Sequence, residues 1–251
     1  MTDLQGNSTA PGATDVVSNW IDCGTYWVNT APQGSKEWFA LRNRPTASKF
    51  GGIAGHSKFD TPDQLARILA GLEKSSFTPE ALERMNAGTL NEPTARNWYC
   101  RTRNVQVNEV GLAVPKWDPM IGASLDGDVL LDNGQSSNGM IEIKCPVRMY
   151  GPLDEYTENV QQGWKPPPGY HNHIWITHYD QMQGCMAITN KRWCDYVVYC
   201  VNEGRVFVER VLFNQSYWDQ ELYPQIKAFN ENLLQPLLRQ TEQVVEVPPG
   251  C

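Results

Sequence analysis

The segment 141–144, Ile-Glu-Ile-Lys, constrains the fold of this chain more than any other, because polar and apolar residues alternate within it. Successive side chains of a β-strand point to opposite faces, so Glu142 and Lys144 project to one side while the two isoleucines pack on the other. A second acidic residue, Asp126, lies sixteen positions before Glu142 and is followed by glycine, as in many turns. The pattern predicts a half-buried strand with an acidic and a basic side chain on one face.

Asp126, Glu142 and Lys144 together suit the hydrolysis of a phosphodiester. Mg²⁺ takes oxygen ligands and keeps several waters, so the two carboxylates and the backbone carbonyl of Ile143 are enough to bind it. Lys144 would then either orient and deprotonate the attacking water or neutralise charge near the scissile phosphate. Without supporting residues, the same pattern is also typical of an ion pair on a solvated strand face, with Asp126 as an ordinary turn residue.

With 251 residues, 41% of them hydrophobic and 20% charged, the chain is long enough to bury one good core. We therefore expect a single domain over residues 19–251, preceded by a disordered tail over residues 1–18, which are mostly small and polar. The net charge of −7 argues against indiscriminate binding to nucleic acid, although a narrow basic channel can coexist with an acidic exterior.

Cysteine usage and hydropathy bear on where the protein resides. The seven cysteines form no CxxC pair, so free thiols in a reducing compartment are expected rather than a zinc ribbon. No apolar run approaches the roughly 18 residues of a transmembrane helix. The first residues also lack the pattern of a secretory signal. We expect an intracellular protein without membrane association, in the cytoplasm or the nucleus.

The order of helix and strand signals predicts one α/β or α+β domain. Thr61-Pro62 and Thr78-Pro79 each place an N-cap residue before a proline at the first helical position. The turn-rich residues 132–139 predict a hairpin loop. The expected helices start at Ser35 (stopped by Pro45), at Thr46 (broken at Gly51-Gly52), and then cover about 62–70, 79–86, 88–103, 175–188 and 217–239. The expected strands cover residues 105–114, 123–131, 140–144, 193–201 and 205–212.

Five segments in register resemble a known family. Residues 122–127, Gly-Ala-Ser-Leu-Asp-Gly, and residues 141–146, Ile-Glu-Ile-Lys-Cys-Pro, are similar to those of the YqaJ-type viral recombinases and lambda phage exonuclease, in the PD-(D/E)xK nuclease superfamily. The resemblance extends to the segment with Trp38-Phe39-Ala40-Leu41-Arg42 and Thr46-Ala47-Ser48, to the GxxxEPxAR helix at 88–96, and to the YxxQxQ helix at 179–183. It covers residues 35–215, and five elements are far more specific than one ExK pair.

The resemblance implies a central mixed sheet flanked by helices, with a restriction-endonuclease-like PD-(D/E)xK core. It implies that Asp126, Glu142 and Lys144 are catalytic and that Glu92 points from its helix to the metal site. It also implies a pocket for the terminal 5′-phosphate, formed by Arg42, Ser48, Ser124 and Gln181. An arginine fork with hydroxyl and amide donors suits a phosphate dianion. Two Mg²⁺ ions are expected, with Mn²⁺ able to substitute.

The activity implied is a DNA exonuclease that processes double-stranded ends from 5′ to 3′ and leaves 3′ single-stranded tails for recombination. A single-strand annealing protein is the expected partner, and a homotrimer around DNA is the expected assembly. Two alternatives stay open: a structure-specific endonuclease of the same superfamily, and an inactive DNA-binding module. The intact Asp126, Glu142 and Lys144 argue against the second.

Several residues also have simpler interpretations. Glu92 could be an acid near a helix N-terminus that complements the dipole, and Gln181 and Gln183 could be polar helix-surface residues. Residues 171–173 spell His-Asn-His but lack the context of an HNH metal site, and a structural role is expected for His178. Leu125 replaces the proline that the family commonly has. The role of residues 150–170 is open, and Trp164 within them could stack on a base.

Overall fold

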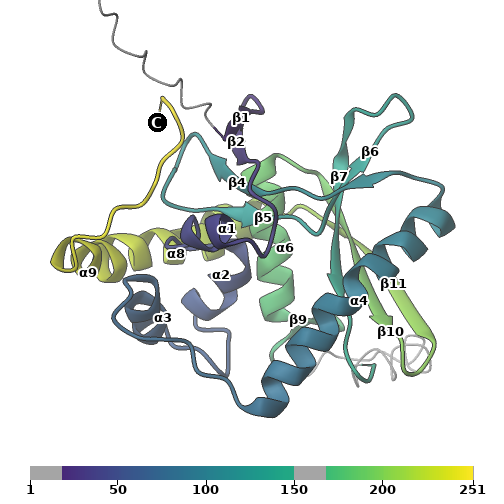
Figure 1. Cartoon of the computed structure of the whole chain (residues 1–251), viewed down its shortest axis with the longest axis horizontal. Coiled ribbons are helices and arrows are strands. Elements are labelled where there is room, and N and C mark those ends of the chain that lie inside the picture. Colours follow the sequence, from purple (N-terminus) through teal and green to yellow (C-terminus); the bar gives the residue numbers. More distant parts are fainter. Residues whose placement is uncertain (1–18, 150–167, 251) are drawn as a thin grey trace, which may run out of the picture.

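A five-stranded mixed sheet is the centre of the structure, a computed structural model that describes residues 19–149 and 168–250 (Figure 1). In spatial order its strands are β11 (Arg205–Leu212), β10 (Trp193–Cys200), β7 (Ser136–Lys144), β6 (Gly127–Leu130) and β3 (Val107–Asn108). The β7–β10 pair is parallel, whereas the other neighbours are antiparallel. The predicted mixed sheet is confirmed. Strand β7 begins at Ser136, so the predicted hairpin loop is shorter than expected, and Gly134 at φ +78° makes its turn.

A second, antiparallel sheet lies beside the first. Its strands, in order, are β1 (Trp20–Asp22), β2 (Tyr26–Asn29), β4 (Leu112–Pro115) and β5 (Ala123–Ser124). The sequence did not indicate β1 and β2. A small hairpin, β8 (Tyr170–His171) and β9 (Ile174–Trp175), contains the His-Asn-His segment, and Asn172 at φ +53° forms its turn. The segment therefore forms the turn of a short hairpin that leads directly into the helix starting at Ile176.

The N-terminal helices begin at the caps that the sequence indicated. They are α1 (Lys36–Ala40), α2 (Ala47–Ile53), α3 (Pro62–Leu69) and α4 (Pro79–Arg103). Thr61 accepts a hydrogen bond from the backbone N–H of Gln64, and Thr78 accepts one from Ala81. These bonds satisfy N–H groups that have no partner within the helix. The predicted starts of α3 and α4 are confirmed.

The predicted break between residues 86 and 88 is wrong, because α4 continues from Pro79 to Arg103. Gly88 and Pro93 both lie inside the helix. The carbonyl that Pro93 leaves without a helical partner belongs to Thr89. Two residues earlier, the carbonyl of Ala87 accepts a hydrogen bond from the Asn91 side chain at 2.8 Å. One helix of this length reaches along the sheet, and packing against the sheet offsets the poor local propensities.

The predicted glycine break after α2 is displaced, because the helix ends at Ile53, one residue beyond Gly52. Gly51 and Gly52 lie inside the helix and are buried. Since neither has a side chain, the helix can approach neighbouring segments closely at these positions. A Cβ added at Gly51 would lie 2.8 Å from the Cα of Thr177 in α6 (Ile176–Thr189), and one added at Gly52 would lie 2.8 Å from Leu65 of α3. The two glycines therefore also allow α2 to pack closely against other helices.

The predicted helices at 175–188 and 217–239 are confirmed as α6 (Ile176–Thr189) and a continuous C-terminal helical run. The run consists of α7 (Gln215–Tyr217), η2 (Trp218–Leu222), α8 (Tyr223–Phe229), η3 (Asn230–Leu234) and α9 (Gln235–Gln240). The η segments are π-helical turns. Each precedes a segment with proline at its start, where the normal hydrogen-bond pattern cannot continue.

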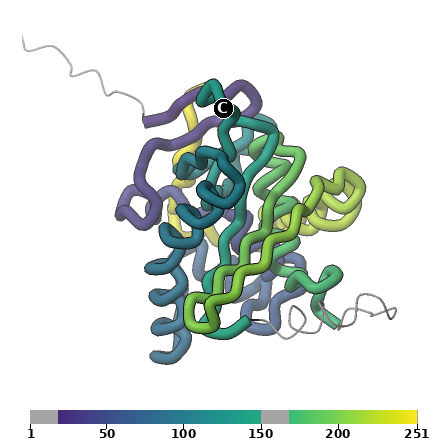
Figure 2. The backbone as a smooth tube through the Cα atoms, turned by 90° about the vertical axis from the view of Figure 1, so that its right-hand side faces the viewer, coloured from purple at the N-terminus to yellow at the C-terminus, as the bar shows by residue number. Residues whose placement is uncertain are grey.

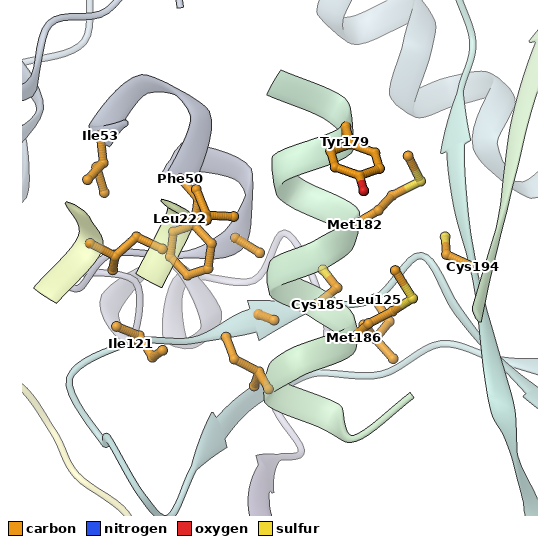
Figure 3. Packing of buried hydrophobic residues seen from close by; sticks show 14 of the residues in the cluster. Phe50, Ile53, Ile121, Leu125, Tyr179, Met182, Cys185, Met186, Cys194 and Leu222 are labelled. Carbon is orange, nitrogen blue, oxygen red and sulfur yellow. The ribbon is translucent and has the colours of Figure 1, made fainter. Parts of the chain in front are cut away.

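Helices cover both faces of the five-stranded sheet. On one face, Ile141 and Ile143 of β7 pack with Ala95 and Tyr99 of α4, and Figure 2 shows α4 beside the long β10–β11 hairpin. On the other face, α6 supplies Met182, Cys185 and Met186 to the main core, as Figure 3 shows. Met140, which lies on the same side of β7 as Glu142 and Lys144, also belongs to this main core. The acidic and basic residues therefore project toward the α6 side of the sheet.

Some expectations fall outside the described residues: the disordered tail over 1–18, Trp164, and most of the segment 150–170. Within the described parts, the six cysteines are free thiols. No helix in those parts is both long enough and apolar enough to cross a membrane.

Candidate active site

One cavity of about 520 Å³ brings together every site residue that the sequence indicated. It lies where β5, β7, α1, α2, α4 and α6 converge. Its lining includes the predicted residues Arg42, Ser48, Glu92, Ser124, Asp126, Glu142, Ile143, Lys144 and Gln181. Segments that are far apart in the chain are thus assembled around a single polar space.

Asp126 and the end of β7 form the acidic part of this cavity. The Oδ2 atom of Asp126 accepts a hydrogen bond of 2.7 Å from the backbone N–H of Ile143. Lys144 Nζ lies 2.7 Å from Glu142 Oε1 and 3.2 Å from Gln181 Oε1, donating to both. Glu142 is 0% exposed. The alternative of an ion pair on a solvated strand face is therefore wrong.

Burial and nearby negative charge raise the pKa of the carboxyl groups in this cavity. Burial, followed by the nearby charge of Asp126, raises the pKa of Glu142 to about 8, although Lys144 opposes this shift. Burial also raises the pKa of Asp126, and burial together with the Asp126 charge raises the pKa of Glu92 to about 7. The site concentrates negative charge that one lysine does not balance.

The donor set fits a hard divalent cation. The Oε2 atom of Glu142 is buried and has no hydrogen-bond partner among the described residues, as expected for an oxygen that a cation would contact. In the same parts of the chain, no three His, Cys, Asp or Glu side chains gather closely enough to form a complete cage. Asp126, Glu142 and the Ile143 carbonyl would thus leave positions for water, as Mg²⁺ prefers.

Glu92 lines the cavity from the middle of α4, fourteen positions after the cap residue Thr78. The alternative that it complements the dipole at a helix N-terminus is therefore wrong, because the effect is confined to the first turn. Its position supports a role beside the metal ligands.

Arg42 is the basic centre of the cavity's other end. Its guanidinium donates to Ser48 Oγ at 2.9 Å and to Thr46 Oγ1 at 3.3 Å, and lies 4.1 Å from the ring centroid of Trp38. Ser48 and Thr46 are presented by the N-terminal turn of α2 and its cap. Trp38 in turn donates from Nε1 to Ser124 Oγ at 3.0 Å. One aromatic ring thus connects both sides of this pocket.

The charge of Arg42 is not balanced by a carboxylate within residues 19–149 and 168–250, where its hydrogen bonds go to hydroxyl groups. Burial lowers its pKa to about 10. A desolvated guanidinium with hydroxyl neighbours is an arrangement that an anion would stabilise.

Two residues of the cavity were missed as functional residues by sequence reasoning. Arg96 donates from Nε to the backbone carbonyl of Asp126 at 3.0 Å and pairs with Glu109, so it orients the turn that carries Asp126. Arg96 lies four residues after Glu92, so both side chains lie on one face of α4. This spacing was visible in the sequence and could have indicated that Arg96 faces the site. Trp38 belonged to a recognised motif, but its indole hydrogen bond depends on tertiary structure.

The remaining candidates have structural roles. Gln183 is 0% exposed and joins the Leu212 carbonyl to the Asn214 N–H, so its interpretation as a surface residue is wrong. Gln181 faces the cavity instead. His178 lies 2.8 Å from the Tyr196 hydroxyl, and burial lowers its pKa well below the usual value.

A second groove, of about 1180 Å³, adjoins the first and shares Thr89, Glu92, Ile143 and Lys144 with it. Apolar side chains line it, including Phe59, Phe77 and Met85, which are all exposed to solvent. Besides Lys144, three basic residues line it: Lys49, Arg84 and Arg148. Glu92 and Lys144 therefore lie where the polar pocket meets a longer groove.

Residues 37–192 match the model of the YqaJ-like viral recombinase domain. The chain belongs to this family. The alkaline exonuclease LHK-Exo from Laribacter hongkongensis is similar in structure, with 27% identity and a TM-score of 0.60 over 83% of this chain and 97% of that one. Its complex with dAMP gives 28% identity, a TM-score of 0.60, and coverage of 83% and 99%.

A phage-related exonuclease from Haemophilus somnus 129PT shares the fold at 14% identity and a TM-score of 0.51, over 78% of this chain and 96% of that one. No curated protein matches the chain in sequence. The family and fold that the sequence motifs indicated are confirmed.

Proposed function

We propose that this protein is a Mg²⁺-dependent DNA exonuclease that degrades one strand of a double-stranded end from 5′ to 3′. One observation carries the proposal: a single cavity contains both the buried carboxylates around Glu142 and the guanidinium of Arg42, which has no carboxylate partner among the described residues. The names of the similar structures, two of them of an alkaline exonuclease, support the same activity.

The 5′-phosphate of the terminal nucleotide would bind to Arg42, Ser48, Ser124 and Gln181. A phosphate dianion there accepts hydrogen bonds from the guanidinium and the hydroxyls and neutralises the charge that burial makes costly. Because the pocket and the carboxylates share one cavity, the phosphate fixes how far from the end the strand is cut. A short fixed distance favours release of mononucleotides, and dAMP is the ligand of one of the similar structures.

Asp126, Glu142 and the Ile143 carbonyl would hold the metal ion, with Glu92 nearby. Bound Mg²⁺ supplies an acidified water and stabilises charge on the phosphoryl oxygens and the departing 3′-oxygen. Gln181 and Glu142 hold the Lys144 ammonium in place through hydrogen bonds. As an ammonium Lys144 would orient the attacking water, whereas it could accept the proton of that water only after losing one of its own. Arg96 would keep the Asp126 turn in position.

The adjoining groove would bind the rest of the strand on the 3′ side of the cut. Exposed aromatic side chains stack on bases and basic side chains track the phosphates, and the groove offers both. Removing one strand leaves a 3′ single-stranded tail, the substrate for an annealing protein. We propose such a protein as the partner and a homotrimer as the assembly, on the basis of the family resemblance.

The direct test is release of nucleotides from linear duplex DNA in the presence and absence of Mg²⁺, with 5′-phosphate, 5′-hydroxyl and closed circular substrates. The wild type should degrade 5′-phosphorylated linear DNA fastest and leave circular DNA intact. Asp126→Ala and Lys144→Ala should lower the rate by at least about a hundredfold. Arg42→Ala should abolish the preference for 5′-phosphate while retaining slow cleavage.

Other outcomes would support the alternatives. Cleavage of circular DNA at a rate similar to that of linear DNA would favour an endonuclease. Tight DNA binding without metal-dependent cleavage would favour an inactive binding module. An Arg42→Ala variant with an unchanged preference for 5′-phosphate would show that the phosphate pocket is assigned to the wrong residues.

A further inference from the structure

Arg44 joins three segments of the chain that are distant in sequence. It lies in the connection between α1 and α2, two positions after Arg42 and two before Thr46, and it is 0% exposed. Its guanidinium donates to the backbone carbonyls of Leu41 at 3.1 Å and Pro119 at 2.6 Å, and also to that of Glu246. A buried guanidinium is stable only where its donors find acceptors, so these carbonyls fix the side chain in one position.

The third of these segments is the C-terminal strap, which we define as residues 243–248, after α9. In Figure 1 the chain climbs from α9 toward β1 and β2. Val244 accepts from the Asn43 side chain at 2.9 Å, and the Glu246 side chain accepts from Trp20 Nε1 at 3.2 Å. A Cβ at Gly71 would overlap the Gln243 amide, so the strap also passes close to the end of α3.

The segments that Arg44 joins carry the two sides of the phosphate pocket. On one side, the connection between α1 and α2 presents Arg42 and leads to Ser48. On the other side, the turn after Pro119 leads through Gly122 to Ser124. The two are hydrogen-bonded to each other, since Gly122 donates to the Pro45 carbonyl at 3.0 Å and accepts from the Ala47 N–H at 2.9 Å. Arg44 connects the two sides, because it lies in the first and donates to the Pro119 carbonyl of the second. The strap holds Arg44 through the carbonyl of Glu246.

We propose that Arg44 and the C-terminal strap are positioning elements for the 5′-phosphate pocket. They set the separation between the Arg42 side and the Ser124 side without contacting the substrate. The inference rests on the proposed function, because it concerns the pocket assigned above to the terminal phosphate. It predicts that residues at the far C-terminus control the preference for 5′-phosphorylated ends.

The test compares kcat and KM on 5′-phosphate and 5′-hydroxyl duplexes for Arg44→Lys and for a chain truncated after Glu242. Lysine keeps the charge but cannot reach three carbonyls in a fixed geometry. Both variants should raise KM for the 5′-phosphate duplex about tenfold and leave kcat nearly unchanged, so that the preference falls by a similar factor. Asn43→Ala, which removes one bond to the strap, is a milder variant and should reduce the preference less.

Matched controls are Arg101→Lys, at an exposed position of α4, and truncation after Pro248, which keeps the strap. Both should retain the wild-type preference. If Arg44→Lys and Asn43→Ala lower the melting temperature but keep the ratio of the two kcat/KM values, Arg44 is merely structural and the proposal is overturned. A wild type with no preference for 5′-phosphate would instead overturn the proposed function. A wild-type preference that Arg42→Ala removes but the Arg44 and strap variants keep would overturn this inference alone.

Discussion

The two carboxylate oxygens of Glu142 lie in different surroundings. Oε1 accepts from Lys144, whereas Oε2 is buried without a hydrogen-bond partner among the described residues. An apolar core would not retain such an atom, because burying an unsatisfied oxygen costs about 1–3 kcal/mol. A cation that contacts Oε2 would offset this cost, so folding and metal binding should be linked.

Glu142→Gln should remove most of this linkage. In the wild type, Mg²⁺ at a hundred times its Kd should raise the free energy of unfolding by about 2.7 kcal/mol, whereas the variant should show little gain at the same concentration. Thermal unfolding with and without Mg²⁺ measures the difference. Glu83→Gln, at an exposed position of α4, is the control and should respond as the wild type does. An equal Mg²⁺ effect in Glu142→Gln would contradict the assignment of Glu142 as a ligand.

His56 makes the stability of the fold depend on pH. Its Nδ1 atom lies 2.8 Å from Oδ2 of the buried Asp180, and this hydrogen bond raises the pKa of the imidazole, although burial opposes the shift. A folded-state pKa above the unfolded value means that the native state binds the proton more tightly. The resulting stability is fully present below the unfolded pKa of 6.5 and is lost as the pH rises through the folded pKa.

The free energy of unfolding of the wild type, measured relative to His56→Gln, should therefore decrease as the pH rises from 6 to 9. The change should be less than about 1 kcal/mol, because a third of the His56 side chain is exposed to solvent. Urea unfolding at several pH values measures both proteins under the same conditions, so other titrating groups cancel. A difference that stays constant over this range would show that the imidazole is not stabilised in its charged form.

At the scale of elements, the contact between α2 and α6 depends on glycines on both helices. Gly51 of α2 lies against Thr177, and a Cβ at Gly184 of α6 would overlap the Phe50 ring. The same α2 carries Ser48 at its start, and α6 carries Gln181. Close packing of the two helices therefore positions Ser48 and Gln181 of the proposed phosphate pocket as well as the core.

Gly51→Ala should destabilise the protein by about 1–3 kcal/mol, because the backbone of Thr177 cannot move away from the new methyl group. Gly88→Ala in α4 is the matched control. Its added Cβ would meet no atom closer than 3.9 Å, so helix propensity alone should stabilise the protein by up to about 1 kcal/mol. Denaturant unfolding of both variants measures whether each substitution lowers or raises the free energy of unfolding. A stabilised Gly51→Ala would mean that α2 and α6 pack less closely than the structure indicates.

At the scale of the whole molecule, an acidic protein must bind an acidic polymer. The net charge is −7, yet basic side chains line both cavities that meet at Lys144. Affinity for DNA should then come from a few local phosphate contacts rather than from a general positive field. The dependence of binding on salt reports how many such contacts form.

Lys49 and Arg84 line the second groove and are predicted to contact two phosphates. Replacing both by alanine should make the slope of log K against log salt less steep by about 1.8 for duplex DNA. DNA binding without Mg²⁺ at several salt concentrations measures the slope. The control is Lys227→Ala with Arg239→Ala, two residues of the C-terminal helical run that line neither groove, and it should keep the wild-type slope. An unchanged slope in the first variant would place the strand outside this groove.

By itself, the sequence determined the features that depend on near neighbours in the chain. The alternation around Glu142, the caps at Thr61 and Thr78, and the spacing of the five motifs predicted the family, the mixed fold and the members of the site. These signals survive because side-chain direction in a strand and hydrogen bonding at a helix end are local properties. Predictions that depended on packing were less successful, since α4 continues through the break predicted between residues 86 and 88.

Only the tertiary structure decided which polar groups lost water and which distant segments met. The burial of Glu142, the burial of Arg42 beside the Trp38 ring and the bond from Arg96 to Asp126 each depend on how the elements pack in space. The Arg44 contact with the C-terminal strap spans 202 positions. Desolvation and close packing depend on the whole fold, since a residue's electrostatic environment is set by whatever lies next to it in space.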